Sequence, residues 1–399
     1  HRDLHSFPTR RSSDLPGFAV QVLANKRGQL SVIRRPGAAS RGDASSGRDA
    51  SSGRDASSGR DASGGRDASG GGAVCAAASA HNKAKRYLLP EGAAVPFLVD
   101  LGVMKGDGTV VKAQYDKFRQ INRFLEFIDD VLPELEAAAA RRPGGQLRII
   151  DFGCGKSYLT FAVYYYLNRR KGLPLRVTGL DLKEDVIASC SRLARGYGYD
   201  GLDFRVGDIA AYDLDGDSAG DAAGEGSAVP GADLVMTLHA CDTATDYALA
   251  KAVSWGARVI LSVPCCQHEL NAQLGKPPHA APGLPGAAGP GEAPGRSALA
   301  VPFRHGIIRE RMAALVTDAL RAELLEACGY RTQILEFIDM SHTPKNLLIR
   351  AVRRDPSAVR GDAVRGDAVR MADARADYEA LRDFLGVSPT LEKALEEQG

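Results

Sequence analysis

Short apolar runs alternate with helical stretches through the second half of the chain, and this alternation limits the possible folds more than any other feature. Five runs have the length and character of buried strands, at residues 147–152, 175–181, 202–208, 233–239 and 257–263. Helical patterns separate most of them, at residues 157–170, 184–195, 243–255 and 309–327. Strands that alternate with helices predict a parallel sheet with right-handed crossovers. Two last runs, residues 332–338 and 346–352, are close enough in sequence to complete the sheet as an antiparallel pair.

Low-complexity segments account for much of the 399-residue length. The first 80 residues hold repeats of the type RDASSG, and residues 1–15 resemble read-through sequence to which we assign no function. We therefore expect a low-complexity, disordered leader at 1–80, a helical extension at 81–142, a domain at 143–352 with inserts at 213–232 and 272–300, and a repeat linker with a C-terminal helix at 353–399. The remaining residues, about 250, suit one α/β domain with an extension.

Composition excludes several classes of protein. The chain is 44% hydrophobic and 25% charged, as in ordinary soluble domains. A net charge of +2 means that any basic surface must be local. Apolar runs stay short of the roughly 20 residues that span a bilayer. Seven cysteines, two of them adjacent, do not suggest a disulfide framework. We expect a cytoplasmic protein without membrane contact and with no obligate protein partner evident.

A glycine turn, Asp151-Phe-Gly-Cys-Gly-Lys-Ser157, lies where the first strand gives way to a helix. Parallel sheets bind ligands at this edge. A phosphate-binding P-loop would need glycine at Ile150, and a dinucleotide fingerprint would need glycine at Tyr158. A nucleoside ligand without pyrophosphate needs only the close backbone approach that Gly153 and Gly155 allow. The carboxylate of Asp151 would face a positive group of that ligand.

S-adenosylmethionine is such a ligand, because it carries an ammonium, a sulfonium and a ribose diol. Asp181 ends the second strand, where a carboxylate would take the ribose hydroxyls, and Asp208 ends the third, near the adenine edge. The alternative is that both residues merely cap the helices that follow. The predicted cofactor-binding residues are Asp151, Gly153, Cys154, Gly155, Lys156, Asp181, Leu182, Asp208, Ile209 and His239.

On these residues the chain resembles the class I S-adenosylmethionine-dependent methyltransferases over roughly residues 145–352. The resemblance implies a Rossmann-like, seven-stranded, doubly wound sheet of order 3-2-1-4-5-7-6 with an antiparallel last strand. It also implies methyl transfer from S-adenosylmethionine. The family's third loop glycine is replaced by Ser157.

The ends of the fourth and fifth strands, residues 237–246 and 263–269, would hold the acceptor. Their sequences TLHACDTATD and VPCCQHE, with Gly-Lys in the first loop, resemble the tRNA 2′-O-methyltransferases with His-Leu-Cys-Gly and Cys-Cys-His signatures and their bacterial and animal relatives. This chain differs at Ala240, Asp242 and Gln267. The resemblance implies RNA, either tRNA or rRNA, as the acceptor. A protein acceptor and a catalytically inactive cofactor-binding adaptor are the alternatives.

Catalysis would need a base or an orienting acceptor near the methyl group. His239, Asp242 and His268 are the candidates, although His239 could instead pack under the cofactor. We interpret the neighbouring cysteines as small buried thiols and expect no metal, because the chain has no Cys-x-x-Cys pair there.

Two basic segments flank the predicted sheet. Lys117, Arg119 and Gln120 lie on the polar side of a helical stretch, and Lys345 with Asn346 lies in the turn before the last strand. Both segments would hold phosphates or the acceptor. The alternatives are a solvated helix face and an ordinary hairpin turn.

Overall fold

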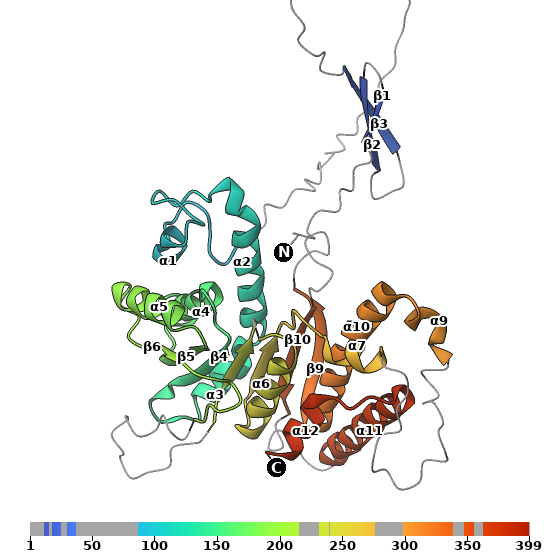
Figure 1. Cartoon of the computed structure of the whole chain (residues 1–399). Helices are drawn as coiled ribbons and strands as arrows, with labels where there is room; N and C mark the ends of the chain where they lie inside the picture. Colours follow the sequence, from blue (N-terminus) through green and yellow to red (C-terminus); the bar gives the residue numbers. More distant parts are fainter. Residues whose placement is uncertain are drawn as a thin grey trace, which may run out of the picture. The chain divides into compact units, whose positions relative to one another are not determined.

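The computed structural model describes the strands within residues 12–36 by their backbone, and residues 87–214, 231–238, 240–275, 298–337, 347–354 and 362–398 (Figure 1). His239, Lys345 and Asn346 lie outside these described residues. The chain divides into two compact units, His1–Ser79 and Ala80–Gly399. No helix in the described part of the chain is both long and apolar enough to cross a membrane.

The first unit contains an antiparallel sheet with strand order β1-β2-β3. Its strands are β1 (Ser12–Leu15), β2 (Phe18–Ala24) and β3 (Leu30–Pro36). Strands thus occur within the segment for which a low-complexity leader was predicted. Their sequences FAVQVLA and LSVIRRP are rich in β-branched and apolar residues, which favour strands.

The second unit is built on a seven-stranded sheet whose order is β6-β5-β4-β7-β8-β10-β9. This is the predicted order 3-2-1-4-5-7-6, and β10 is antiparallel to both of its neighbours, as predicted. The strands are β4 (Leu147–Phe152), β5 (Leu175–Asp181), β6 (Leu202–Val206), β7 (Leu234–Thr237), β8 (Val259–Ser262), β9 (Tyr330–Glu336) and β10 (Leu347–Arg353).

Alternate residues of the central strands enter two separate cores. In β4, Leu147 and Ile149 pack into one core, whereas Ile150 and Phe152 pack into the other. A strand that is buried on both faces must be apolar throughout, which is why the parallel strands read as continuous apolar runs. The sheet is therefore doubly wound.

Helices cover both faces of this sheet (Figure 1). The helices that precede α6 in the chain contribute buried side chains to the first core, and α6 and the helices after it contribute to the second. The helices are α1 (Pro96–Asp100), η1 (Lys112–Gln114), α2 (Tyr115–Asp130), α3 (Leu132–Ala139), η2 (Pro143–Gly145), α4 (Tyr158–Tyr164), η3 (Tyr165–Arg170), α5 (Glu184–Gly196), α6 (Thr243–Ser254), α7 (Glu269–Leu274), α9 (Ala300–Phe303), α10 (Gly306–Ala327), α11 (Asp362–Leu385) and α12 (Thr390–Glu396).

The segment before the sheet packs as part of the domain. Phe118, Phe124 and Phe127 of α2 are buried in the same core as β4. The rings of Phe124 and Phe337 meet edge to face at 5.9 Å. The amphipathic pattern of α2 thus places this helix against the sheet, beside the glycine turn that it flanks.

The C-terminal segment differs from its prediction. Helix α11 begins at Asp362, inside the RGDAV repeat that was expected to form a loop. The repeat has no proline within the helix, and Arg354 bonds to Asp367 at 3.2 Å, which ties it to the end of β10. Helices α7, α9 and α12 were not predicted, because each is too short to show a helical period.

Candidate functional site

The glycine turn joins the ends of β4 and β5. Gly153 and Gly155 have positive φ angles of 66° and 51°, which glycine adopts without steric cost. The backbone N–H of Cys154 donates to the carbonyl of Leu180 at 2.9 Å. The backbone N–H of Gly155 donates to Oδ2 of Asp181, also at 2.9 Å. The structure thus brings the predicted turn and the predicted second-strand carboxylate into direct contact.

Asp151 places a buried carboxylate beneath this turn. One oxygen, Oδ2, accepts a hydrogen bond from the hydroxyl of Thr160, whereas Oδ1 has no partner among the described residues. Burial raises the pKa of Asp151 to about 7; the hydrogen bond from Thr160 opposes this rise and the nearby charge of Asp181 adds to it. A buried acceptor without a donor is costly unless a ligand supplies one. The ammonium of S-adenosylmethionine is a donor that fits it.

The other predicted cofactor residues lie at the same sheet edge. Asp181 is half-buried, and its Oδ1 accepts the backbone N–H of Lys183 at 3.0 Å. Leu182 is 70% exposed, so its apolar side chain is available to a bound ligand. Asp208 is exposed, its Oδ1 accepts the N–H of Ala210 at 3.0 Å, and Ile209 beside it is half-buried. Each carboxylate thus accepts from the backbone two residues further on, but neither caps a helix, because Lys183 is the N-cap of α5 and residues 209–214 form no helix. Each retains an oxygen lone pair for a ligand.

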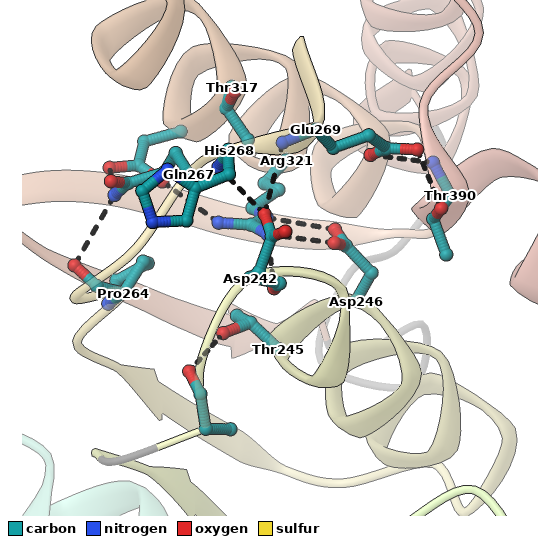
Figure 2. Close-up of polar contacts among 12 residues, drawn as sticks. Asp242, Thr245, Asp246, Pro264, Gln267, His268, Glu269, Thr317, Arg321 and Thr390 are labelled. Atoms are coloured by element: carbon teal, nitrogen blue, oxygen red, sulfur yellow. Dashed lines mark hydrogen bonds and ion pairs between the residues drawn. The ribbon is translucent and has the colours of Figure 1, made fainter. Parts of the chain in front are cut away.

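Asp242 joins the loops that follow β7 and β8 (Figure 2). Its Oδ1 accepts the backbone N–H groups of His268 at 2.8 Å and Glu269 at 3.1 Å, at the start of α7. Its backbone, at φ 53° and ψ −124°, has the geometry of a turn position where glycine predominates. The side chain of this predicted catalytic residue therefore has a positioning role in the structure.

A buried charge cluster lies behind this loop (Figure 2). Arg321 bonds to both carboxylate oxygens of Asp246, at 2.8 and 2.7 Å, and to Asp318 at 3.2 Å. It also donates to the carbonyl of Asp242 at 3.0 Å. Burial raises the pKa of Asp318 to about 6, although Arg321 lowers it. Gln267 donates to Asp318 at 2.9 Å, which anchors the loop after β8.

Three cysteines meet at the same strand ends. The Sγ atoms of Cys241 and Cys265 are 3.3 Å apart, and those of Cys265 and Cys266 are 3.7 Å apart. All three Sγ atoms lie within 4.8 Å of one another, and Cys241 is exposed. Burial first, and then the neighbouring thiols, raise the pKa of Cys265 to about 12. The interpretation as buried packing residues is wrong for Cys241, because its side chain faces solvent.

The remaining candidates are only partly gathered at this edge. The ammonium of Lys117 lies 3.8 Å from the ring centre of Tyr158, the residue that follows the glycine turn. Arg119 is exposed and pairs with Asp116 on its own helix, and Gln120 is half-buried. His268 is exposed at the start of α7. His239, Lys345 and Asn346 cannot be placed because they lie outside the described residues.

Sequence reasoning missed the residues that support the site. Thr160 bonds to Asp151 from one turn into α4, and Arg321 comes from α10, 75 positions after Asp246. The only signal for Arg321 is its spacing of three residues from Asp318, which makes a cation and a carboxylate neighbours on one side of the helical stretch.

Comparison with known proteins identifies the domain. Residues 116–273 match the family model of a methyltransferase domain. The match covers about two-fifths of the chain, from α2 to α7. With the strand order and the strand-end carboxylates described above, this match confirms the predicted enzyme class, a methyltransferase that uses S-adenosylmethionine. The match begins in α2, so this helix and α3 lie within the matched region and α1 lies outside it.

Solved structures that resemble the chain do so at low identity. The magnesium protoporphyrin IX methyltransferase of Synechocystis, with bound SAH, is 17% identical over 62% of this chain and 90% of its own, with a TM-score of 0.31. The citrinin polyketide synthase CMeT domain is 16% identical over 54% of this chain and 48% of its own, with a TM-score of 0.30. The chain thus spans about half the length of the latter. No curated protein matches the chain.

Proposed function

We propose that the chain transfers the methyl group of S-adenosylmethionine to RNA, either tRNA or rRNA. The observation that carries the cofactor half of this proposal is the buried, partnerless Oδ1 of Asp151 under the glycine turn. The acceptor would approach along the ends of β7, which is adjacent to β4 in the sheet, and β8, which is the next strand. An RNA acceptor is supported by Lys156 within the turn and by Lys117, which contacts Tyr158 directly after it; both supply positive charge for phosphates.

The chain's own residues would bind the cofactor, orient the acceptor and remove the acceptor's proton. The sulfonium supplies the leaving group when the cofactor is bound, so the protein mainly aligns the acceptor in line with the methyl group. Asp151 would hold the ammonium, and Asp181 would accept from the ribose hydroxyls. Asp242 already accepts two backbone N–H groups, which makes it a positioning residue. Of the described candidates, His268 is then the exposed base that could take the acceptor proton.

The test is transfer of a tritiated methyl group into separated RNA and protein pools. We expect label in RNA, a loss of labelling in Asp151→Asn, and a large fall in rate for His268→Ala with unchanged binding of S-adenosylhomocysteine. Label in protein alone would refute the RNA acceptor and favour a protein methyltransferase. Cofactor binding without labelling of either pool would favour the inactive adaptor.

The basic residues allow a matched control. Lys117→Gln and Lys156→Gln should weaken RNA binding and lower its salt dependence, because each lysine releases about one counterion from the phosphates. Lys251→Gln, on α6, removes a lysine that is not part of the glycine turn and serves as the control. Equal RNA affinity and equal salt slopes in all three variants would contradict the assignment of these lysines to phosphates.

A further inference from the structure

We propose that Cys241, Cys265 and Cys266 form a zinc site at the ends of β7 and β8. Their three Sγ atoms lie within 4.8 Å of one another, on two loops that are well separated in sequence. Thiolates are preferred ligands of Zn²⁺. This site goes beyond methyl transfer and does not depend on which acceptor the enzyme uses.

The sulfur positions agree with zinc geometry. A Zn–S distance of about 2.3 Å with tetrahedral angles places two ligand sulfurs about 3.8 Å apart. The observed Sγ separations are 3.3 Å for Cys241 and Cys265, and 3.7 Å for Cys265 and Cys266. Side-chain rotations that move each Sγ by less than about 0.5 Å would bring the first pair to the required separation. The third pair, Cys241 and Cys266, lies within 4.8 Å, so its separation needs to shorten by no more than about 1 Å.

The surrounding structure fixes the two loops that carry the thiols. The hydroxyl of Thr245 donates to the carbonyl of Ala240 at 2.7 Å, which holds the loop before Cys241. The amide of Gln267 donates to the carbonyl of Pro264 at 3.3 Å, which holds the loop that carries the cysteine pair. Asp242 bonds across from one loop to the other. Such fixed supporting bonds are typical of metal sites, because they hold the ligands in place before the metal binds.

Packing does not account for this cluster. Cys154 and Cys190 show how the chain uses cysteine as a core residue, since each is 3% exposed in an apolar cluster. Cys241 is instead exposed, and Cys265 and Cys266 are half-buried. A partly exposed group of thiols contributes little to the packing of a core. A metal site, in contrast, needs an entry path from solvent, which the exposed Cys241 provides.

Binding of Zn²⁺ by the three cysteines would release protons and leave one coordination position of the metal open. Three thiols and Zn²⁺ give a tris-thiolate complex of charge −1 and three protons, with no change in oxidation state. A fourth ligand, water or an acceptor atom, would complete the tetrahedron from the exposed side of Cys241. Three protein ligands and one open position are the pattern of zinc sites that act on a substrate.

The first experiment measures metal content. We expect about one zinc per full-length chain purified without chelators, and a loss of at least tenfold in Cys241→Ser and Cys265→Ser. Cys328→Ser, which removes a half-buried thiol outside the cluster, is the matched control and should keep its zinc. Zinc retained by both cluster variants, or lost equally from the control, would overturn the proposal.

The second experiment uses the unmutated protein, so it does not depend on whether the variants fold. Reduced, zinc-free protein is titrated with Co²⁺, and reactive thiols are counted before and after zinc is added. We expect the intense thiolate-to-cobalt absorption of a tetrahedral site, and three fewer reactive thiols with zinc. No cobalt spectrum, or an unchanged thiol count, would refute the site. A Cys241–Cys265 disulfide in place of metal, found by peptide mass, would show that the cluster is redox-active instead.

Discussion

The binding of the cofactor should depend on pH through Asp151. This carboxyl is buried, has a pKa of about 7, and is expected to hold the ammonium of the cofactor in its charged form. Protonation removes the charge that attracts the ammonium. Binding should therefore weaken as pH falls through 7. Asp151→Asn, which keeps the size of the side chain but cannot ionise, should bind weakly at every pH.

The magnitude follows from the pKa. At pH 8 about nine-tenths of the Asp151 carboxyl groups are ionised, and at pH 6 about one-tenth are. The Kd of S-adenosylhomocysteine, which carries the same ammonium, should therefore be about tenfold higher at pH 6, or about 1.4 kcal/mol weaker. Loss of the charged hydrogen bond in the asparagine variant should cost roughly 1.5–3 kcal/mol at pH 8.

The same carboxyl should affect stability with the opposite sign. Its pKa in the folded chain, about 7, exceeds the usual 3.8, so the native state holds the proton that the unfolded state loses. The free energy of unfolding should therefore fall as pH rises from about 4 to about 7, by up to about 4 kcal/mol. Asp151→Asn lacks this penalty, so at pH 8 and without cofactor it should be more stable than the wild type.

Two assays separate these effects. Calorimetric titration with S-adenosylhomocysteine between about pH 6 and 8 measures affinity, and denaturant unfolding without cofactor between about pH 4 and 8 measures stability. Asp208→Asn, an exposed carboxylate of the same edge, is the control and should keep the wild-type pH dependence. The role given to Asp151 would be refuted if the Kd of S-adenosylhomocysteine did not change with pH in the wild type. It would also be refuted if the Kd of the Asp151→Asn variant changed with pH as the wild type's does.

Three further substitutions test the structural reasoning. Arg321→Met leaves two buried carboxylates without their cation and should lower the free energy of unfolding by about 3–5 kcal/mol, measured in urea. Asp242→Asn keeps an oxygen for the α7 backbone and should retain most methyl transfer, whereas a fall of a hundredfold or more in kcat would make Asp242 the base. Gly179→Ala would put a Cβ 2.6 Å from the ring of Phe204; it should cost about 1–3 kcal/mol, and an unchanged melting temperature would argue against this packing.

The sheet was predictable because strands that are buried on both faces appear in the sequence as continuous apolar runs. In β4, residues of both parities must be apolar, and the acidic residue that ends the run marks the ligand edge. The helix α11 was not predictable in the same way. Its repeat RGDAV has five residues, which matches neither a helical nor a strand period, and its first turns are tied down by the distant Arg354.

The cofactor edge was more accessible to sequence reasoning than the acceptor edge. Asp151 and Asp181 could be located from their places at strand ends, because the sheet alone brings those ends together. The contacts of Asp242 depend instead on how two loops and α10 fold against each other. Arg321 and Asp246 are 75 positions apart, and no local pattern links them. Sequence therefore suggested a base or an orienting acceptor at Asp242, and the structure adds that its side chain orders the two loops.

Each of the two edges, the cofactor edge and the acceptor edge, contains one residue with an unusual backbone conformation. Among the described residues with side chains, only Ser157 and Asp242 have a positive φ, at 56° and 53°. Both replace a glycine in the motifs that the chain resembles, and each such replacement costs on the order of 1–2 kcal/mol in backbone strain. Each gains bonds that glycine cannot make: Ser157 donates to the carbonyl of Gly155 at 3.2 Å, and Asp242 holds the start of α7. Because these bonds fix the turn that would hold the cofactor and the loops that carry the thiols, the strain is located where the chain orders its two ligand-facing edges.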